Sequence, residues 1–207
     1  MGERQDEILD AFARIVTQQG INNTTMRDVA REVGCSVGTL YNEFANKEAL
    51  IYGLYQHAQT TTDSLLADLS VFCKAPPEMR LRRFVIGFIR EINVRIREDR
   101  IFAEFLKDGC HFRYIGMKSL EFRQAVKGKV IDILAEILAK GVEGGTFHLA
   151  NIPLAAQLVM EAFSAYLTPA LVLDREIEAI LQDAEAMLDL VIRALKCSGN
   201  HDMDGGI

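Results

Sequence analysis

Apolar side chains recur at the spacing of an α-helix along almost all of this 207-residue chain, and no run alternates apolar and polar residues as a half-buried strand does. Glycines and prolines interrupt the pattern and mark the ends of the expected helices. The helices expected are a first one ended by Gly20, others over 26–33, 37–44, 47–69, 84–96, 101–106 and 126–138, and two final ones over 153–168 and 174–196. The chain is therefore predicted to be all-α, with about nine helices.

The composition is that of a folded globular protein and argues against several other classes. Hydrophobic residues make up 49% of the chain and charged residues 25%, which is too apolar for a disordered protein. The net charge of -6 gives no overall basic field that would indicate nucleic acid. The N-terminal residues are charged and contain no apolar signal segment, and the four cysteines are dispersed without a CxxC pair. We expect a cytoplasmic protein with reduced cysteines, no metal site and no cofactor.

The most apolar stretch, residues 152–173, is long enough to raise the question of a membrane span. It contains Gln157 and Glu161, and Pro169 interrupts it. Polar and ionisable residues are costly inside a bilayer, so we expect a helix buried within a helical bundle and no membrane partner.

Two short helices near the N-terminus are joined in a specific way. Thr25 precedes the helix over 26–33 and Asp28 follows three residues later, which is the pattern of a capping box. Gly34 can adopt a left-handed conformation without steric cost, and Ser36 can cap the next helix. This arrangement fits a helix-turn-helix, although a plain corner between two helices fits the same spacing.

In a helix-turn-helix, the second helix would pack through Val37, Leu40 and Phe44. Its other face would then present Gly38, Thr39, Asn42 and Glu43. Small residues allow close approach to bases, and an amide can bond to base edges or phosphates. Lys47, at the start of the next helix, could pair with a phosphate.

The run from Thr24 to Ile51, TTMRDVAREVGCSVGTLYNEFANKEALI, closely resembles the DNA-binding domain of TetR-type (tetracycline-repressor-like) transcriptional regulators. The match includes the threonine before the second helix, the DVAREVG segment, the S-x-G-T-L-Y core, the aromatic Phe44 and the K-E-x-L that opens the fourth helix. The rest of the chain agrees with the family in length, in helical character and in two apolar final helices. The resemblance implies a helix-turn-helix DNA-binding domain over 1–50 and a ligand-binding and dimerisation domain over 51–197. Residues 198–207 are polar and rich in glycine, so we expect a flexible tail there.

The resemblance also implies which residues meet DNA. In this family, the positions that match Thr25, Tyr41 and Lys47 contact phosphates. The set expected at or near the DNA is Thr25, Arg27, Ser36, Val37, Gly38, Thr39, Tyr41, Asn42, Glu43 and Lys47.

Two of these positions depart from the family pattern. Many relatives carry a lysine or arginine at the position of Val37 and a histidine at that of Glu43. A carboxylate near phosphates repels them, unless Glu43 accepts a hydrogen bond from a cytosine amine or pairs with Arg27 or Lys47. We therefore expect modest nonspecific affinity and a strong dependence on the sequence of the DNA site.

For the larger part of the chain, the resemblance implies a partly apolar small-molecule effector bound among the middle helices. The candidate ligand-binding residues are Phe84, Phe88, Glu91, Phe102, Phe105, His111, Phe122, Met160, Phe163 and Tyr166. For each aromatic member, ordinary core packing is the competing explanation. A homodimer through the last two helices is also implied. Wide apolar stripes on both helices support it independently, because we expect one protomer's core to cover only part of them.

Charge is concentrated in the middle of the chain. Residues 80–129 hold 13 basic and 6 acidic residues, including Arg80, Arg82 and Arg83. This excess could attract an anionic ligand, and a solvated helix face is the simpler explanation.

The resulting hypothesis is a ligand-responsive transcriptional repressor, which binds a palindromic DNA operator as a dimer and is released by a small-molecule effector. A transcriptional activator of the same fold and a helical protein-interaction module are the alternatives. An enzyme is the rival class. The sequence has no P-loop, GxGxxG, GxSxG or HExxH motif, and its four histidines have no metal-binding spacing, so we identify no catalytic residue.

Overall fold

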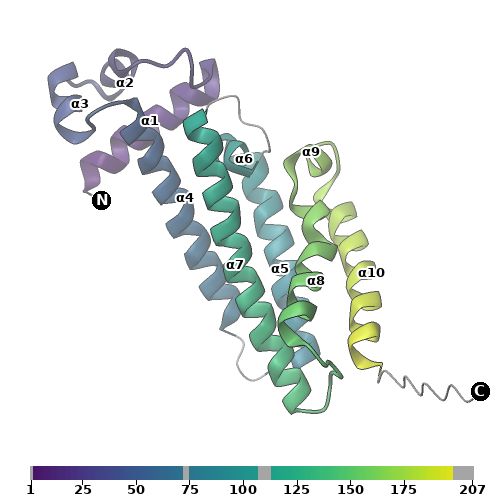
Figure 1. The fold of residues 1–207 in the computed structure, drawn as a ribbon. Helices are drawn as coiled ribbons and strands as arrows, with labels where there is room; N and C mark the ends of the chain where they lie inside the picture. Colours follow the sequence, from purple (N-terminus) through teal and green to yellow (C-terminus); the bar gives the residue numbers. More distant parts are fainter. Residues whose placement is uncertain (1, 72–74, 107–112, 198–207) are drawn as a thin grey trace, which may run out of the picture. The chain divides into compact units, whose positions relative to one another are not determined.

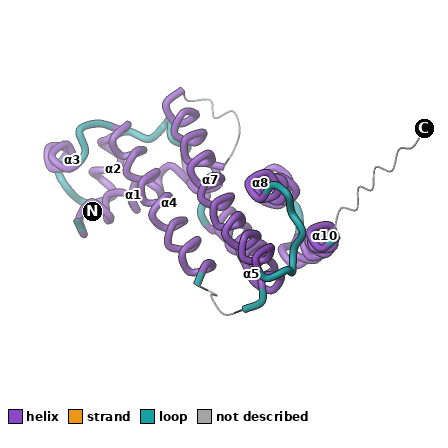
Figure 2. The backbone as a smooth tube through the Cα atoms, turned by 60° about the horizontal axis from the view of Figure 1, so that its bottom comes forward, coloured by secondary structure: helices purple, strands orange, loops and turns teal. Residues whose placement is uncertain are grey.

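The computed structural model describes residues 2–71, 75–106 and 113–197, and every regular element in them is helical (Figures 1 and 2). The prediction of an all-α chain is confirmed. The expected tail over 198–207 lies outside the described residues. The helices are α1 (Glu3–Gln19), α2 (Met26–Val33), α3 (Val37–Glu43), α4 (Lys47–Ser70), α5 (Pro77–Glu98), α6 (Arg100–Leu106), α7 (Arg113–Glu143), α8 (Ile152–Phe163), the 3-10 helix η1 (Ser164–Leu167), α9 (Pro169–Val172) and α10 (Ile177–Lys196).

The chain divides into two compact units, and the division falls inside α4, α5 and α7. Unit 1 comprises Met1–Ser64 and Arg95–Val126, and unit 2 comprises Leu65–Val94 and Lys127–Ile207. Each unit has its own apolar core. Unit 1 buries Ile8, Phe12, Leu40, Leu50 and Phe122 completely, and unit 2 does the same with Leu81, Leu138, Ile180, Ala184 and Leu188.

The ends of the short helices in unit 1 follow from local sequence. Thr25 accepts a hydrogen bond from the amide of Asp28, and the Asp28 carboxylate accepts one from the amide of Thr25 at 2.9 Å, which completes the predicted capping box. Gly34 ends α2 with a φ of 73°, in the left-handed region that glycine adopts readily. The Ser36 side chain accepts from the amide of Thr39 at 3.0 Å and so begins α3 as expected.

The helices of the second half differ from the expected ones. Helix α7 begins at Arg113, well before the apolar stripe that starts at Val126. The single helix expected over 153–168 is α8, which ends at Phe163 and is followed by η1 and the separate helix α9. Proline lacks an amide donor and disfavours the helical conformation in the preceding residue, so Pro169 starts a new helix instead of extending the old one.

Ion pairs attach α10 to α5 within unit 2. The guanidinium of Arg82 donates hydrogen bonds to the carboxylates of Glu185 and Asp189, and Lys196 at the end of α10 pairs with Glu78, one turn before Arg82 on α5. The bond from Arg82 lowers the pKa of Asp189. In the same unit, Asn93 is completely buried and donates to the backbone oxygen of Tyr166 at 2.7 Å. A buried amide needs such a partner, and here the bond links α5 to η1.

In the part of the chain that the structure describes, no helix combines the length and apolar character that crossing a membrane requires.

Candidate nucleic-acid interface

One face of α3 packs against the core of unit 1, and the opposite face is exposed to solvent. Leu40 and Phe44 are buried, as predicted, whereas Val37 is only half-buried. Gly38 and Asn42 are exposed, and the side chain of Tyr41 is 50% exposed. The apolar anchor of α3 therefore rests chiefly on Leu40 and Phe44.

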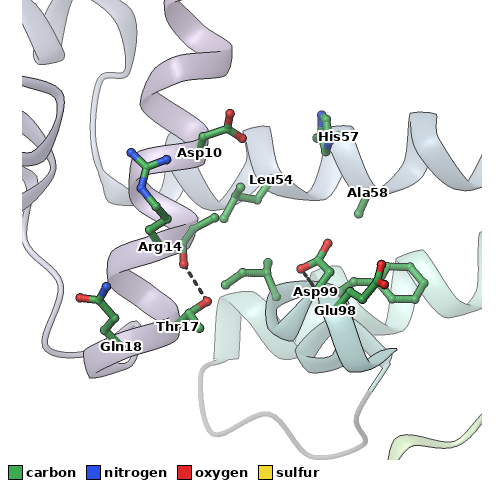
Figure 3. Close-up of a pocket in the computed structure, with 12 residues that line it drawn as sticks. Asp10, Arg14, Thr17, Gln18, Leu54, His57, Ala58, Glu98 and Asp99 are labelled. Atoms are coloured by element: carbon green, nitrogen blue, oxygen red, sulfur yellow. Dashed lines mark hydrogen bonds between the residues drawn. The ribbon is translucent and has the colours of Figure 1, made fainter. Parts of the chain in front are cut away.

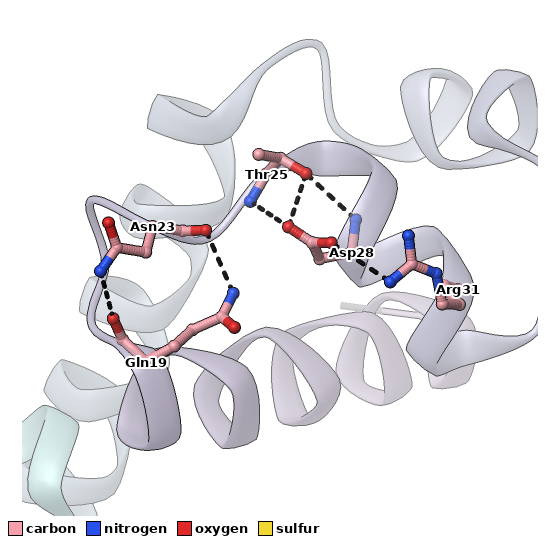
Figure 4. A network of polar contacts seen from close by, with 5 residues as sticks. All are labelled: Gln19, Asn23, Thr25, Asp28 and Arg31. Atoms are coloured by element: carbon pink, nitrogen blue, oxygen red, sulfur yellow. Dashed lines mark hydrogen bonds and ion pairs between the residues drawn. The ribbon is translucent and has the colours of Figure 1, made fainter.

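Several hydroxyl groups expected near DNA already have partners. The Thr25 hydroxyl donates to the Asp28 carboxylate at 2.6 Å, and Arg31 pairs with the same carboxylate at 3.5 Å (Figure 4). These hydrogen bonds from Thr25 lower the pKa of Asp28, and the positive charge of Arg31 adds to the effect. The hydroxyl groups of Ser36 and Thr39 lie 2.8 Å apart and share a hydrogen bond. In the free protein, these residues hold α2 and α3 in place.

Three other polar side chains of the predicted set have no partner in the described part of the chain. Arg27, Tyr41 and Asn42 are exposed and make no hydrogen bond or ion pair with any residue that the structure describes. A guanidinium, a phenol and an amide provide donors that suit phosphate oxygens, and the amide can also read an adenine edge. These three groups are therefore available to a partner molecule.

Lys47 and Glu43 contact residues of unit 1 that the sequence pattern did not indicate. The Lys47 ammonium lies 3.5 Å from the backbone oxygen of Asn22, in the loop before α2, and burial lowers its pKa. Glu43 accepts a hydrogen bond from the side chain of Gln5 on α1 at 3.3 Å. Its partner is therefore Gln5, and neither Arg27 nor Lys47, which were the protein partners considered from the sequence.

Asn46 is a structural residue that the sequence reasoning missed. Its side-chain oxygen accepts from the amide of Ala49 at 2.8 Å, so it caps the start of α4 and fixes the position of Lys47. Asparagine directly before a helical run is a recognised signal for such a cap. The loop that faces Lys47 is held by reciprocal bonds between Gln19 and Asn23, each side chain donating to the other's backbone oxygen (Figure 4).

Unit 1 also contains an open groove of about 450 Å³ between α1, α4 and the α5–α6 corner (Figure 3). Its apolar surface comes from Leu54, Ala58 and Phe102, and its polar edge includes Asp10 and Asp99. Of the candidate ligand-binding residues whose side chains the structure describes, only Phe102 lines it.

The candidate ligand-binding residues fall into two groups. In unit 2, Phe84, Phe88, Met160 and Phe163 line one cavity of about 20 Å³, and the ring of Tyr166 lies 6.1 Å from that of Phe163. A cavity of that size holds about one water molecule. These side chains are therefore packed as core in this structure, while Glu91 is exposed.

In unit 1, the rings of Phe102 and Phe122 are nearly perpendicular, with centroids 5.8 Å apart. Tyr55, which was not in the predicted set, extends this cluster by an edge contact with Phe122 at 6.1 Å. His111 and the side chain of Phe105 lie outside what the structure describes.

Comparison with known proteins gives a consistent result. A family model described as bacterial regulatory proteins of the tetR family matches residues 8–52, and one described as a tetracyclin repressor-like C-terminal domain matches residues 77–188. The chain is similar to the HTH-type transcriptional repressor KstR2 of Mycolicibacterium smegmatis, with 28% identity over 70% of this chain and 68% of that protein. It is equally similar to the HTH-type transcriptional regulator TtgR of Pseudomonas putida, with 28% identity over 75% of this chain and 69% of that one. The fold is similar to that of SmeT in a complex with triclosan, with a TM-score of 0.68 and 18% identity over 93% of this chain and 91% of that one.

Proposed function

The chain belongs to the TetR family of bacterial regulatory proteins and is a ligand-responsive, DNA-binding transcriptional repressor; from that premise we propose that two copies bind a palindromic operator and that a small-molecule effector releases them. Each copy would place α3 in a major groove. Two-fold partners present such helices to successive grooves about 34–36 Å apart. We also propose that residues 1–50 bind DNA and that residues 51–197 bind the ligand and form the dimer.

The observation that carries the proposal is the set of uncommitted polar groups on and beside α3. Arg27, Tyr41 and Asn42 have no partner within the described part of the chain, whereas the capping residues around them are fully engaged. A rigid scaffold with free donors is the arrangement that DNA contact requires. Lys47 adds a partly buried cation, and a phosphate near it would offset the cost of that burial.

The dimer surface that we propose lies on α8 and α10, which pack side by side in unit 2 (Figure 1). Val159, Phe163 and Leu188 from the expected stripes are used in the protomer's own core. The exposed remainder includes Leu154 and Leu158 on α8, at 49% and 59% exposure, and Leu190 on α10, at 59%. Ala186 and Ala194 lie one turn on either side of Leu190 and are exposed, so a second pair of helices can approach closely.

Release by an effector requires the ligand to bind two dimer geometries with different affinity. A dimer geometry that no longer matches the groove spacing would lose one of its two recognition contacts. The effector would thereby lower operator affinity without touching DNA.

The test is footprinting on the promoter regions that flank the protein's own gene, followed by mobility shifts on the protected fragment. We expect a two-fold symmetric footprint, and operator affinity that exceeds the affinity for random DNA at every salt concentration tested. Equal affinity for both would contradict the expected site selectivity. Failure to enrich any sequence from a random DNA library would favour the interaction-module alternative instead.

A further inference from the structure

Arg95 is a partly buried cation with no carboxylate partner among the residues that the structure describes. Its Nη1 donates to the hydroxyl of Thr62 at 3.0 Å, and its Cζ lies 4.1 Å from the ring centroid of Phe102. No described carboxylate lies within ion-pair distance of it. Burial lowers the pKa of Arg95, although Asp99 one turn later opposes this shift.

Other basic residues of the same stretch have carboxylate partners or are exposed to solvent. Arg82 is held by two carboxylates, Arg80 by Glu136, and Lys127 by Glu161. Arg90 has no described partner, but it is exposed to water and needs none. Among these, Arg95 alone combines partial burial with the lack of a counter-ion. The positive excess of residues 80–129 therefore includes a partly buried guanidinium that is in ion-pair contact with no described carboxylate.

The groups around Arg95 leave part of its hydrogen-bonding capacity open. A guanidinium has five N–H donors in one plane, and only one of them has a described acceptor. The hydroxyl of Thr62 is completely buried and is itself fixed, because it donates to the backbone oxygen of Ala58 at 2.8 Å. The Phe102 ring covers one face of the guanidinium, which holds the plane in position. An anion could therefore bind edge-on to a cation that is already oriented.

The surroundings favour an anion attached to an apolar body. Phe102, Phe122 and Tyr55 form a continuous aromatic cluster next to the guanidinium. On α4, Ala58 lies one turn, about 6 Å along the helix, before Thr62 and lines the groove of Figure 3. Phe102, which stacks on the guanidinium, lines the same groove. A small inorganic anion would gain nothing from this surface.

We propose that Arg95, supported by Thr62 and Phe102, binds the carboxylate of an amphiphilic organic acid, and that such an acid is the class of effector for this chain. This inference rests on the proposed ligand-responsive function. The guanidinium would donate to both carboxylate oxygens, and the apolar body would lie in the groove of Figure 3, which Ala58 and Phe102 line.

The test uses the full chain and three probes of equal length: decanoate, decanol and decyltrimethylammonium, each below its micelle concentration. Calorimetric titration should show decanoate binding at least about tenfold more tightly than decanol, because a charged hydrogen-bonded pair is lost with the alcohol. Tighter binding of the ammonium probe would assign ligand recognition to the acidic edge of the groove and overturn the proposal. Equal binding of decanoate and decanol would also overturn it.

Three substitutions to methionine separate a binding role from a structural one. Arg95→Met should weaken decanoate binding at least about tenfold and leave the melting temperature unchanged or higher, since it removes a desolvated charge. Arg82→Met should lower the melting temperature, because two ion pairs break, and keep decanoate binding. Arg90→Met should change neither, which controls for net charge. If Arg95→Met does not fold, Arg95→Lys keeps the charge without the planar fork and should still bind decanoate less tightly.

The two proposals fail in different ways. Wild-type protein that binds its operator but does not distinguish decanoate from decanol contradicts the effector class alone. Wild-type protein that binds decanoate through Arg95 but selects no DNA contradicts the regulatory function alone. A falling melting temperature in Arg95→Met, with decanoate binding retained, would show that Arg95 is structural.

Discussion

Gly38 occupies the second position of α3, and a methyl group added there would meet only the hydroxyl oxygen of Ser36, at 3.8 Å. Alanine is the better helix former, so Gly38→Ala should leave the free protein as stable as the wild type or up to about 1 kcal/mol more stable. If α3 lies against DNA, the same methyl group enters a packed interface, where overpacking costs about 1–3 kcal/mol. Operator affinity should then fall by about tenfold, measured by mobility shift beside thermal unfolding. Unchanged affinity would mean that Gly38 does not face the operator.

Gly141 has a role that helical periodicity did not indicate. The pattern ended the expected helix at residue 138, but α7 continues through Gly141 to Glu143, and Gly145, with a φ of 68°, makes the turn. A Cβ on Gly141 would lie 2.0 Å from the ring of Phe147, which is 1% exposed. The glycine makes room for this ring. No local sequence pattern predicts such a contact between a helical glycine and a ring that follows the helix.

Gly141→Ala should therefore destabilise the protein by about 2 kcal/mol or more, because the buried ring of Phe147 must move. Gly128→Ala in the same helix is the matched control, since it is exposed and has nothing within 4 Å of the added methyl group. That control should be neutral or stabilising by up to about 1 kcal/mol. Denaturant titration of both variants tests the pair, and a loss of equal size in both would refute the role assigned to Phe147.

At the scale of elements, the start of α2 makes a pH-dependent prediction. Hydrogen bonds from Thr25 lower the pKa of Asp28 in the folded protein. A carboxyl group whose pKa is depressed on folding stabilises the protein above its unfolded pKa of about 3.9, and this contribution is lost as the pH falls through the folded value. The stability gap between wild type and Asp28→Asn should thus be largest near neutral pH and shrink below about pH 4.

The measurement is denaturant unfolding of both proteins over a series of pH values. Other carboxylates titrate alike in both, so the difference isolates Asp28. A gap that is constant with pH would contradict the ionised capping box.

The helices that the sequence predicted well are those whose ends are set by neighbours in the chain. Thr25, Gly34 and Ser36 define α2 and α3 through contacts within four residues, and all three were predicted. The division into α8, η1 and α9 depends on Pro169 and also on the bond from Asn93 to the backbone of Tyr166, far away in sequence. Boundaries of that second kind are set by tertiary packing, which helical periodicity does not report.

At the scale of the whole molecule, the same distinction separates the two candidate sites. The nucleic-acid candidates lie within one short run, so their grouping in unit 1 follows from the local fold. The described ligand candidates come from α5, α6, α7, α8 and η1. Their aromatic members divide between the cores of unit 2, around Phe84 and Phe163, and unit 1, around Phe102 and Phe122. Aromatic composition predicted the residues to consider but not which of them meet. It also left out Arg95, because a single arginine within an apolar stripe resembles any amphipathic helix.

Assembly is the last property to test at this scale. The leucines at 154, 158 and 190, on α8 and α10, are roughly half exposed. Exposed apolar side chains do not stabilise an isolated protomer, but they can be buried in an interface. Leu158→Lys combined with Leu190→Lys places four charges in a two-fold interface and leaves each protomer's core intact. We expect the wild type to sediment as a dimer and the double variant as a folded monomer.

Val71→Lys is the matched control, because Val71 is 69% exposed and lies at the end of α4, outside the proposed interface. It should remain dimeric. Operator affinity should fall steeply in the double variant and not in the control, since a monomer holds only one half-site and loses the gain from linked binding. A double variant that still sediments as a dimer would place the interface on another surface. A monomer that retained full operator affinity would instead contradict the two-fold mode of binding, and with it the need for an effector to act through dimer geometry.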